Sequence, residues 1–152
     1  MRITDMLRQD FVSLSLQAKD KEGALSELCS LLSSKVKFDH DAVVRVLLER
    51  EKLGSAGIGD GIAIPHGKLK DLDDIHIAFG RSQEGIPFNS IDGKPVHLFF
   101  LLLAPEKSTG QHLKILAKLS RMLKDENFRK LLMSAQMLDE LYRIISEKDN
   151  VY

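Results

Sequence analysis

The sequence predicts an α/β fold with three layers, α/β/α, in which a central mixed β-sheet is flanked by helices. Three patterns point to it: two helical periods early in the chain, short apolar runs typical of strands in the middle, and helical periods again after Pro105. Because the strands have helices on both sides in sequence, helices can cover both faces of one sheet. The 152 residues, 43% of them hydrophobic, suffice for one buried core, so we expect a single domain over residues 1–152.

The first third of the chain is expected to form a short strand and two helices. Residues 11–16 alternate apolar and polar side chains, as a half-buried strand does. Asp20 can cap a helix that ends near residue 33, because its carboxylate can accept hydrogen bonds from the first free amides of a helix. Asp39 can cap a second helix in the same way, and Gly54 would end it.

The middle of the chain begins with glycines. Five of the ten glycines fall between residues 54 and 67, so we expect a shaped loop that lets the backbone approach another group closely. Within it, residues 62–64 have the pattern of a short buried strand, which Pro65 ends because proline cannot donate to a β-ladder.

Two strands and three helices complete the prediction. The strands are expected at about residues 75–81 and 96–103, and the second is apolar on both faces, as a central strand is. The helices are expected at about residues 109–123, 126–133 and, beginning at residue 134 or 135, up to 146.

Composition excludes several classes of function. The 22 Lys and Arg residues balance 22 Asp and Glu residues, so the chain lacks the basic field of a nucleic-acid-binding protein. Its longest apolar run, residues 98–104, is far shorter than the roughly 20 residues that span a bilayer, and its first residues do not resemble a secretory signal. Cys29, the single cysteine, falls on the apolar face of its helix and is expected in the core. We therefore expect a cytoplasmic protein with no membrane insertion and no nucleic-acid partner.

The strongest chemical signal surrounds His66, at the end of the glycine-rich run. Pro65 fixes the approach of the chain, and Gly67 adds no side chain that would shield the ring. Imidazole suits a phosphoryl carrier, because its ordinary pKa of roughly 6.5 leaves it largely neutral and nucleophilic at pH 7. The tripeptide Pro-His-Gly fits a turn histidine without chemistry equally well, and the wider glycine cluster favours the nucleophile.

Arg50 is a second candidate. On its helix it shares an apolar stripe with Val43 and Leu47, so we expect it to point inward and to need a charged partner. Since that helix leads directly into the glycine-rich run, the guanidinium could bind an anion held at His66. The alternative is an arginine at the edge of the core that extends into solvent.

His112 is the third candidate. Ile115 and Leu119 share its face, so the ring is expected to point inward from the first turn of its helix. If Ser108 or Thr109 caps this helix, the helix dipole favours a neutral imidazole and a bound anion nearby. A hydrogen-bonded core histidine is the alternative.

Other site chemistries find little support. His40, His76 and His97 are expected to be structural or exposed, and the five histidines show neither the His-x-x-x-His spacing nor a Cys-x-x-Cys motif that would predict a metal site. A Gly-x-Ser-x-Gly elbow and a Gly-x-x-x-x-Gly-Lys-Ser/Thr loop are also absent from the sequence, which argues against a serine hydrolase and a nucleotide-binding loop.

The run from Arg50 to Lys68, followed at a distance by Gln111-His112-Leu113, resembles the IIA domain of the phosphoenolpyruvate-dependent phosphotransferase system (PTS), fructose/mannitol type, or EIIA type 2. The similarity extends over essentially the whole chain, including its order of expected elements. It implies one such domain over residues 1–152, with a mixed sheet between helices and no cofactor, metal or nucleotide.

The resemblance also implies the roles of individual residues. His66 would be phosphorylated by the phosphocarrier HPr, with His112 as the second active-site histidine and Arg50 as the site arginine. Less diagnostic positions give three pocket candidates, which are Ser55, Gly67 and Lys68.

Within this family, residues 50–59 are more similar to the nitrogen-regulatory branch than to the sugar-transport branch. The length, with no fused IIB or membrane IIC part, agrees with that expectation. Phosphorylation of His66 would then control which target proteins bind. The alternatives are a sugar-specific IIA component that passes the phosphoryl group to a IIB domain, an interaction module that acts independently of phosphorylation, and a metal enzyme with His66 and His112 as ligands.

Overall fold

A mixed β-sheet forms the middle of the molecule in this computed structural model, which describes residues 2–152. Its strands lie in the order β1–β5–β6–β3–β2, and β4 pairs with β6 beyond the end of β3. β5 runs antiparallel to β6, whereas β3 and β4 run parallel to it. The strands are β1 (Val12–Ser13), β2 (Gly57–Gly59), β3 (Ile62–Ala63), β4 (His66–Leu69), β5 (His76–Ile86) and β6 (Val96–Pro105).

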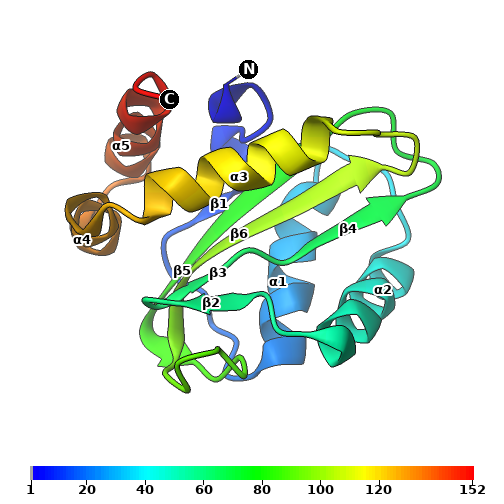
Figure 1. Cartoon of the computed structure of the whole chain (residues 1–152), viewed down its shortest axis with the longest axis horizontal. Helices are drawn as coiled ribbons and strands as arrows, with labels where there is room; N and C mark the ends of the chain where they lie inside the picture. The colour runs from blue at the N-terminus through cyan, green and yellow to red at the C-terminus, as the bar shows by residue number, and fades with distance from the viewer. Residues whose placement is uncertain (1) are drawn as a thin grey trace.

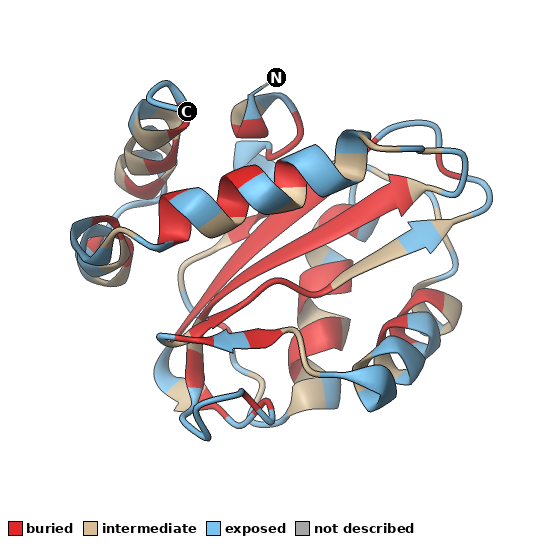
Figure 2. Ribbon diagram, viewed as in Figure 1, coloured by how far each residue is buried: buried red, intermediate tan, exposed pale blue. Residues whose placement is uncertain are grey.

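Helices cover both faces of this sheet. α1 (Lys21–Ser33) lies behind it in Figure 1, α2 (His40–Leu53) packs on α1 and β4 at the edge of the sheet, and α3 (Gln111–Leu123) crosses its front. β6 between them is buried from Val96 to Ala104 except at His97, and Figure 2 shows the buried residues gathered along the inner strands and on the helix surfaces that face them. The predicted α/β fold with a mixed sheet between helices is confirmed, and so is the central position of the strand at residues 96–103.

The first two helices begin where their caps were predicted. The Asp20 carboxylate accepts a hydrogen bond of 2.7 Å from the Gly23 amide, and the Asp39 carboxylate accepts one of 3.2 Å from the Ala42 amide. Between the two caps, Cys29 on α1 is fully buried, and burial raises the pKa of its thiol to about 12. The thiol is therefore protonated and unreactive, as expected of a core residue.

The C-terminal helices are α4 (Glu126–Ser134) and α5 (Leu138–Asp149). α5 begins three or four residues later than predicted, because the chain is extended from Ala135 to Met137. Two contacts hold this extended segment. Oε1 of Glu140 accepts hydrogen bonds from the amides of Gln136 and Met137, and buried Arg81 donates from Nη1 to the Ala135 carbonyl. Among residues 2–152, no helix is long and apolar enough to cross a membrane.

A buried ion pair joins α3 and α5. Lys118 Nζ lies 2.5 Å from the Asp149 carboxylate, which also accepts a hydrogen bond from the Thr4 amide. Burial opposes ionisation of Asp149, but the hydrogen bonds from Lys118 and from the amides of Ile3 and Thr4 outweigh it, so the pKa of this carboxyl lies below its usual value. The pair fixes α3, whose other end carries His112, against the chain termini.

Candidate functional site

The glycine-rich run forms a tight hairpin that leads to His66. β2 and β3 are antiparallel and are joined by Asp60 and Gly61, which both have positive φ angles, 57° and 75°. This is the geometry of a type I′ turn, for which Asp-Gly is a favoured pair. The predicted loop is therefore partly strand, and the glycines at its turn supply conformations that other residues rarely adopt.

Pro65 separates two short strands, β3 and β4, that both pair with β6. β3 ends at Ala63, one residue earlier than predicted, but the Pro65 carbonyl accepts a hydrogen bond of 2.9 Å from the Leu102 amide of β6. The chain then resumes pairing as β4, with His66 opposite Leu102. His66 is thus the first residue of a strand and not a turn residue, and its backbone is fixed by the central strand.

Two contacts define the state of the half-buried His66 ring. Nδ1 lies 2.9 Å from the Ile64 carbonyl, which can only accept, so Nδ1 carries the proton. Nε2 lies 3.3 Å from Nη2 of Arg50, which can only donate. In the neutral ring both contacts favour the same tautomer, with a lone pair on Nε2. That lone pair faces Arg50.

The structure places Arg50 beside His66 but corrects its predicted inward position. Arg50 is exposed, and so are its stripe neighbours Val46 and Leu53, at 45% and 83%. Val43 and Leu47 are buried because α2 packs its first turns on α1 and β4. The last turn has no such cover, since α2 lies at the edge of the sheet (Figure 1) and leads out toward β2. The guanidinium reaches His66 along the surface.

A pocket of about 280 Å³ lies between the end of α2, the following loop and His66. Arg50, Glu51, Ser55 and His66 are the polar residues that line it. The predicted pocket residue Ser55 thus lines the same pocket as His66. A pocket of this size, open to solvent and carrying a guanidinium, can hold a small anion next to Nε2.

Glu51, which sequence reasoning missed, fixes the wall of this pocket. Its Oε2 accepts a hydrogen bond of 2.9 Å from the Ala56 amide, and its Oε1 forms an ion pair of 2.9 Å with Lys21. The Ser55 hydroxyl donates to the Phe88 carbonyl at 2.7 Å. A carboxylate in the last turn of a helix is unfavourable for the helix dipole, and this was the available sign that Glu51 has a specific partner.

Gly67 faces α2 from β4. A Cβ atom at this position would lie 3.4 Å from Cδ2 of Leu47, an ordinary van der Waals contact, on the side of the strand opposite to His66. The position therefore has room for alanine but not for a long side chain, which would push the strand from the helix that carries Arg50. Exposure of the ring, the role expected from the sequence, does not depend on this Cβ.

His112 lies in the first turn of α3, and the start of this helix differs from the prediction. Gly110 is the cap residue and makes no side-chain cap bond. Ser108 contacts the ring instead, with its Oγ 3.2 Å from Nδ1 of His112. Burial lowers the pKa of His112, and the positive charge of Lys68, with that of His66 whenever its ring is protonated, lowers it further. His112 is half-buried, so the inward prediction holds in part, and its lowered pKa favours the neutral ring.

Lys68 connects the two halves of the site. It lies two residues after His66 on β4, and its Nζ donates a hydrogen bond of 3.1 Å to the Ser108 carbonyl. Strand β4 thereby holds the loop that precedes α3. The predicted residues His66, Arg50, His112 and Lys68 thus gather at one edge of the sheet, together with Ser108, which the sequence suggested only as a helix cap.

The other histidines have structural contacts. His97 and His40 bind backbone carbonyls at 2.9 Å, those of Ser82 and Ser26, and burial lowers the pKa of His76, whose ring packs edge-to-face on Phe11. Within residues 2–152, no group of three or more His, Cys, Asp or Glu side chains is placed to hold a metal ion.

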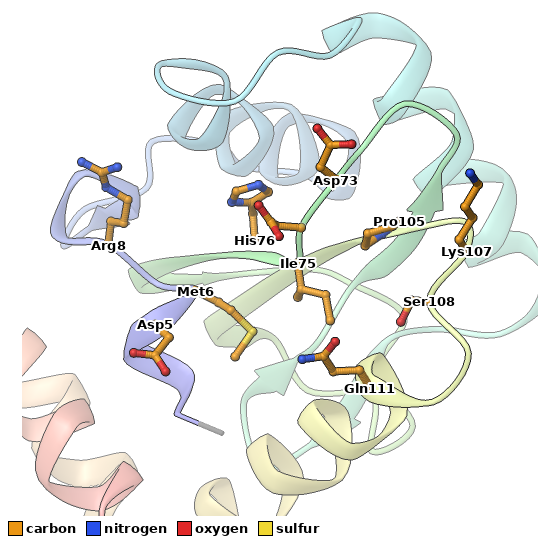
Figure 3. A pocket seen from close by; sticks show the side chains of 11 residues that line it. Asp5, Met6, Arg8, Asp73, Ile75, His76, Pro105, Lys107, Ser108 and Gln111 are labelled. Carbon is orange, nitrogen blue, oxygen red and sulfur yellow. The ribbon is translucent and has the colours of Figure 1, made fainter.

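A larger cavity of about 540 Å³ lies beyond the β6–α3 loop. Figure 3 shows Ser108 and Gln111 on one side of it and Asp5, Met6 and Arg8 on the other. His66, Arg50 and His112 are not among its lining residues. Ser108 therefore stands between this cavity and the His112 ring.

Comparison with known proteins gives consistent matches. A family model described as "Phosphoenolpyruvate-dependent sugar phosphotransferase system, EIIA 2" matches residues 5–148. The nitrogen regulatory protein of Bradyrhizobium diazoefficiens is 40% identical over 146 residues, covering 96% of this chain and 95% of that protein. The fructose-specific EIIABC component of Bacillus subtilis is 39% identical over 150 residues, which are 98% of this chain but 24% of that protein.

A solved structure agrees. The crystal structure of the nitrogen regulatory protein IIA-Ntr from Neisseria meningitidis superimposes with a TM-score of 0.89 at 36% identity, covering 94% of this chain and 98% of that one.

Proposed function

The chain belongs to the phosphoenolpyruvate-dependent sugar phosphotransferase system EIIA 2 family and is a phosphocarrier of that system, and we propose that it carries the phosphoryl group on His66. In this proposal the donor is an HPr-like phosphocarrier, and residues 1–152 work as a single EIIA type-2 domain. The observation that carries the proposal is the state of the His66 ring. Its Nδ1 is held as a donor by the Ile64 carbonyl, so the lone pair is on Nε2, at the pocket.

The transfer step follows from this tautomer. The Nε2 lone pair attacks the phosphorus atom of the donor phosphohistidine, a P–Nε2 bond forms, and the donor's N–P bond breaks with its electron pair returning to the donor ring. The His66 ring then carries a positive charge that it shares with Nδ1. The hydrogen bond from Nδ1 to the Ile64 carbonyl stabilises that charge, because it strengthens when the donor is cationic.

Cationic and polar groups meet the incoming charge. A phosphoryl group brings up to two negative charges and three acceptor oxygens. Arg50 is already within 3.3 Å of Nε2, and its planar fork can move from the ring nitrogen to two phosphoryl oxygens. Lys68 and His112, which are coupled electrostatically to each other, supply a further charge and a ring N–H. We assign Arg50 and His112 as catalytic residues beside His66 and Ser55 as a pocket residue. The other two pocket candidates, Gly67 and Lys68, do not line this pocket, and we assign them as residues of β4 that position the site.

We further propose that the phosphorylation state of His66 is a signal and that the chain is a nitrogen-regulatory IIA component. The match to a nitrogen regulatory protein over almost the full length of both chains supports this reading. The site also suits a switch. Exposed Leu53 and Leu113 lie next to the pocket and to His112, so a partner that covers them would meet either a neutral ring or a dianion.

The second candidate is a sugar-specific IIA component that passes its phosphoryl group to a IIB domain. The 39% identity to a fructose-specific EIIABC component favours it, since that relative's name joins the A part to B and C parts. An interaction module that binds the same partners regardless of phosphorylation is the third.

Labelling tests the phosphocarrier step. Incubation with phosphoenolpyruvate, enzyme I and HPr should give one acid-labile phosphate per chain and none in His66→Ala. The label should be unchanged in the control His40→Ala, whose ring contacts α1 from the first residue of α2, at the opposite end of this helix from Arg50. Label in His66→Ala, or none in the parent chain, contradicts the proposal.

Partner capture separates the three roles. A regulatory component should retain different proteins in its phosphorylated form and as His66→Ala. A sugar-specific component should instead lose its label to a IIB domain within seconds, and a phosphorylation-independent module should retain one set of partners in both forms.

A further inference from the structure

The loop between β6 and α3 provides a contact for which the proposed function has no role so far. The Oγ atom of Ser108 lies 3.2 Å from Nδ1 of His112. The backbone of Ser108 is held by two hydrogen bonds. Its amide donates to the Pro105 carbonyl at 2.9 Å, and its carbonyl accepts from Lys68 Nζ at 3.1 Å. The hydroxyl is therefore presented to the ring by a fixed main chain.

Resting on the proposed function, we propose that Ser108 is a positioning residue: its hydroxyl donates to Nδ1 of His112 and holds this ring in the tautomer with the proton on Nε2, which donates a hydrogen bond to the phosphoryl group on His66. The substrate of the site is unchanged. Ser108 would decide which nitrogen of His112 carries the proton and therefore which one can donate to the phosphoryl group.

The direction of the Ser108 hydrogen bond follows from its surroundings. A hydroxyl can donate or accept, so the distance alone does not decide which it does. A phosphoryl group offers only acceptors at neutral pH, so a ring nitrogen that faces it must carry a proton. A neutral imidazole has one proton, and once that proton is on Nε2 the other nitrogen, Nδ1, must accept. Ser108 is the hydroxyl within reach of it.

The charges around His112 support this arrangement. Burial and the positive charge of Lys68 lower the pKa of His112, which favours the neutral ring in the unphosphorylated protein and with it an Nδ1 that can accept. Lys68 contributes twice, because the same ammonium group donates to the Ser108 carbonyl. Strand β4 thus carries the nucleophile at position 66 and, two residues later, the clamp for the loop that orients the second histidine.

Ser108 permits a clean substitution. Ser108→Ala removes the hydroxyl and leaves both backbone hydrogen bonds, and the new methyl group lies beside the large cavity of Figure 3, where it meets no crowding. Ser108→Thr keeps a hydroxyl. Ser134→Ala is a matched control, because the Ser134 hydroxyl donates to a helix carbonyl at 3.3 Å and lies at the end of α4.

The experiment measures the ring directly. The ¹⁵N chemical shifts of His112 are recorded in the phosphorylated protein and in Ser108→Ala, Ser108→Thr and Ser134→Ala, together with the rate of phosphoryl return to unphosphorylated HPr. We expect protonated Nε2 and unprotonated Nδ1 in the parent chain, in Ser108→Thr and in the control. Ser108→Ala should show a mixture of tautomers and a change of about two- to tenfold in the transfer rate, the range for one neutral hydrogen bond.

The outcomes separate the inference from the proposed function. A parent chain that cannot be phosphorylated contradicts both. A parent chain that is phosphorylated on His66, with Nδ1 of His112 protonated, contradicts the inference alone. The same holds if Ser108→Ala keeps the Nε2–H tautomer, whatever happens to its rate, since Ser108 would then act only on loop structure.

Discussion

Replacing Arg50 by glutamine should shift the phosphoryl-transfer equilibrium away from this chain by about five- to thirtyfold, the range that follows from the hydrogen bonds Arg50 can make in the two states of His66. The perturbation removes the guanidinium that lies 3.3 Å from Nε2 of His66 and keeps a polar side chain of similar reach. Because Arg50 is exposed on the last turn of α2, its loss leaves no buried group without a partner. The change should therefore act on the phosphoryl group and not on folding.

The size of this shift follows from the hydrogen bonds of Arg50 to His66 before and after phosphorylation. In the unphosphorylated protein it makes one long hydrogen bond to a neutral ring, worth about 0.5–1 kcal/mol. In the phosphorylated protein a forked pair of charge-assisted hydrogen bonds is worth about 1.5–3 kcal/mol. The difference of about 1–2 kcal/mol favours the phosphorylated state, and about 1.4 kcal/mol corresponds to a factor of ten. Solvent exposure of Arg50 places the expected value in the lower half of this range.

The assay is an equilibrium between this chain and its donor. Equal concentrations of phosphorylated HPr and unphosphorylated chain are mixed, and ³¹P NMR gives the fraction of phosphoryl group on each. Arg45→Gln is the matched control, since Arg45 is also exposed on α2 and its substitution changes the net charge equally. An equilibrium in Arg50→Gln equal to that in Arg45→Gln would refute the reasoning. Arg50→Lys should fall between the two, because lysine keeps the charge without the fork.

Three further predictions concern the frame of the site. Arg81→Met should lower the free energy of unfolding by about 3 kcal/mol, because the carbonyls that accept from Arg81 lose their donor. Urea unfolding measures this free energy, and a loss below about 1 kcal/mol contradicts the prediction. Asp149 has a pKa below its usual 3.8, so its contribution to the free energy of unfolding is complete above about pH 4 and is lost as the pH falls through the lowered pKa. Asp149→Asn should therefore make the free energy of unfolding less dependent on pH below about pH 4. An unchanged dependence would count against the ion pair with Lys118. Gly67→Leu should slow phosphorylation by pushing α2 from β4, whereas Gly67→Ala should not; equal labelling rates would show that this packing does not set the site.

The parts of the fold that could be predicted depend on local chemistry. Asp20 and Asp39 cap their helices because a carboxylate at that position meets free amides a few residues later. β6 is central because its residues are apolar on both faces. β4 was missed since its partner lies 36 residues further along the chain at each paired position, as in His66 with Leu102. Glycine and proline in this segment indicated a loop, and only the parallel register to β6 makes it a strand.

The site shows the same division. The proposal of His66 as a site residue rests on its neighbours in sequence, because Pro65 and the glycine cluster restrict the backbone locally. The inward position of Arg50 was wrong because a helical stripe predicts burial only where the whole length of the helix is covered, and the last turn of α2 is not. The contact of Lys68 with Ser108 follows from the pairing of Lys68 with Ala104 on β6, which brings the next loop within reach of the lysine. No local pattern contains that register.

The two histidines of the site are held by different kinds of partner, and this difference decides where the site can be tuned. Nδ1 of His66 donates to a main-chain carbonyl, which every residue at position 64 supplies, so substitutions there leave the nucleophilic nitrogen unchanged. Nδ1 of His112 contacts a side chain, and Arg50 and Lys68 act through side chains as well. In the proposed function the fold therefore fixes His66 as the nucleophile, and we expect the lifetime of its phosphoryl group to depend on three replaceable side chains, those of Arg50, Lys68 and Ser108. A chain that stores a signal and one that passes the group on at once can therefore share one fold and one nucleophile, and differ at positions 50, 68 and 108.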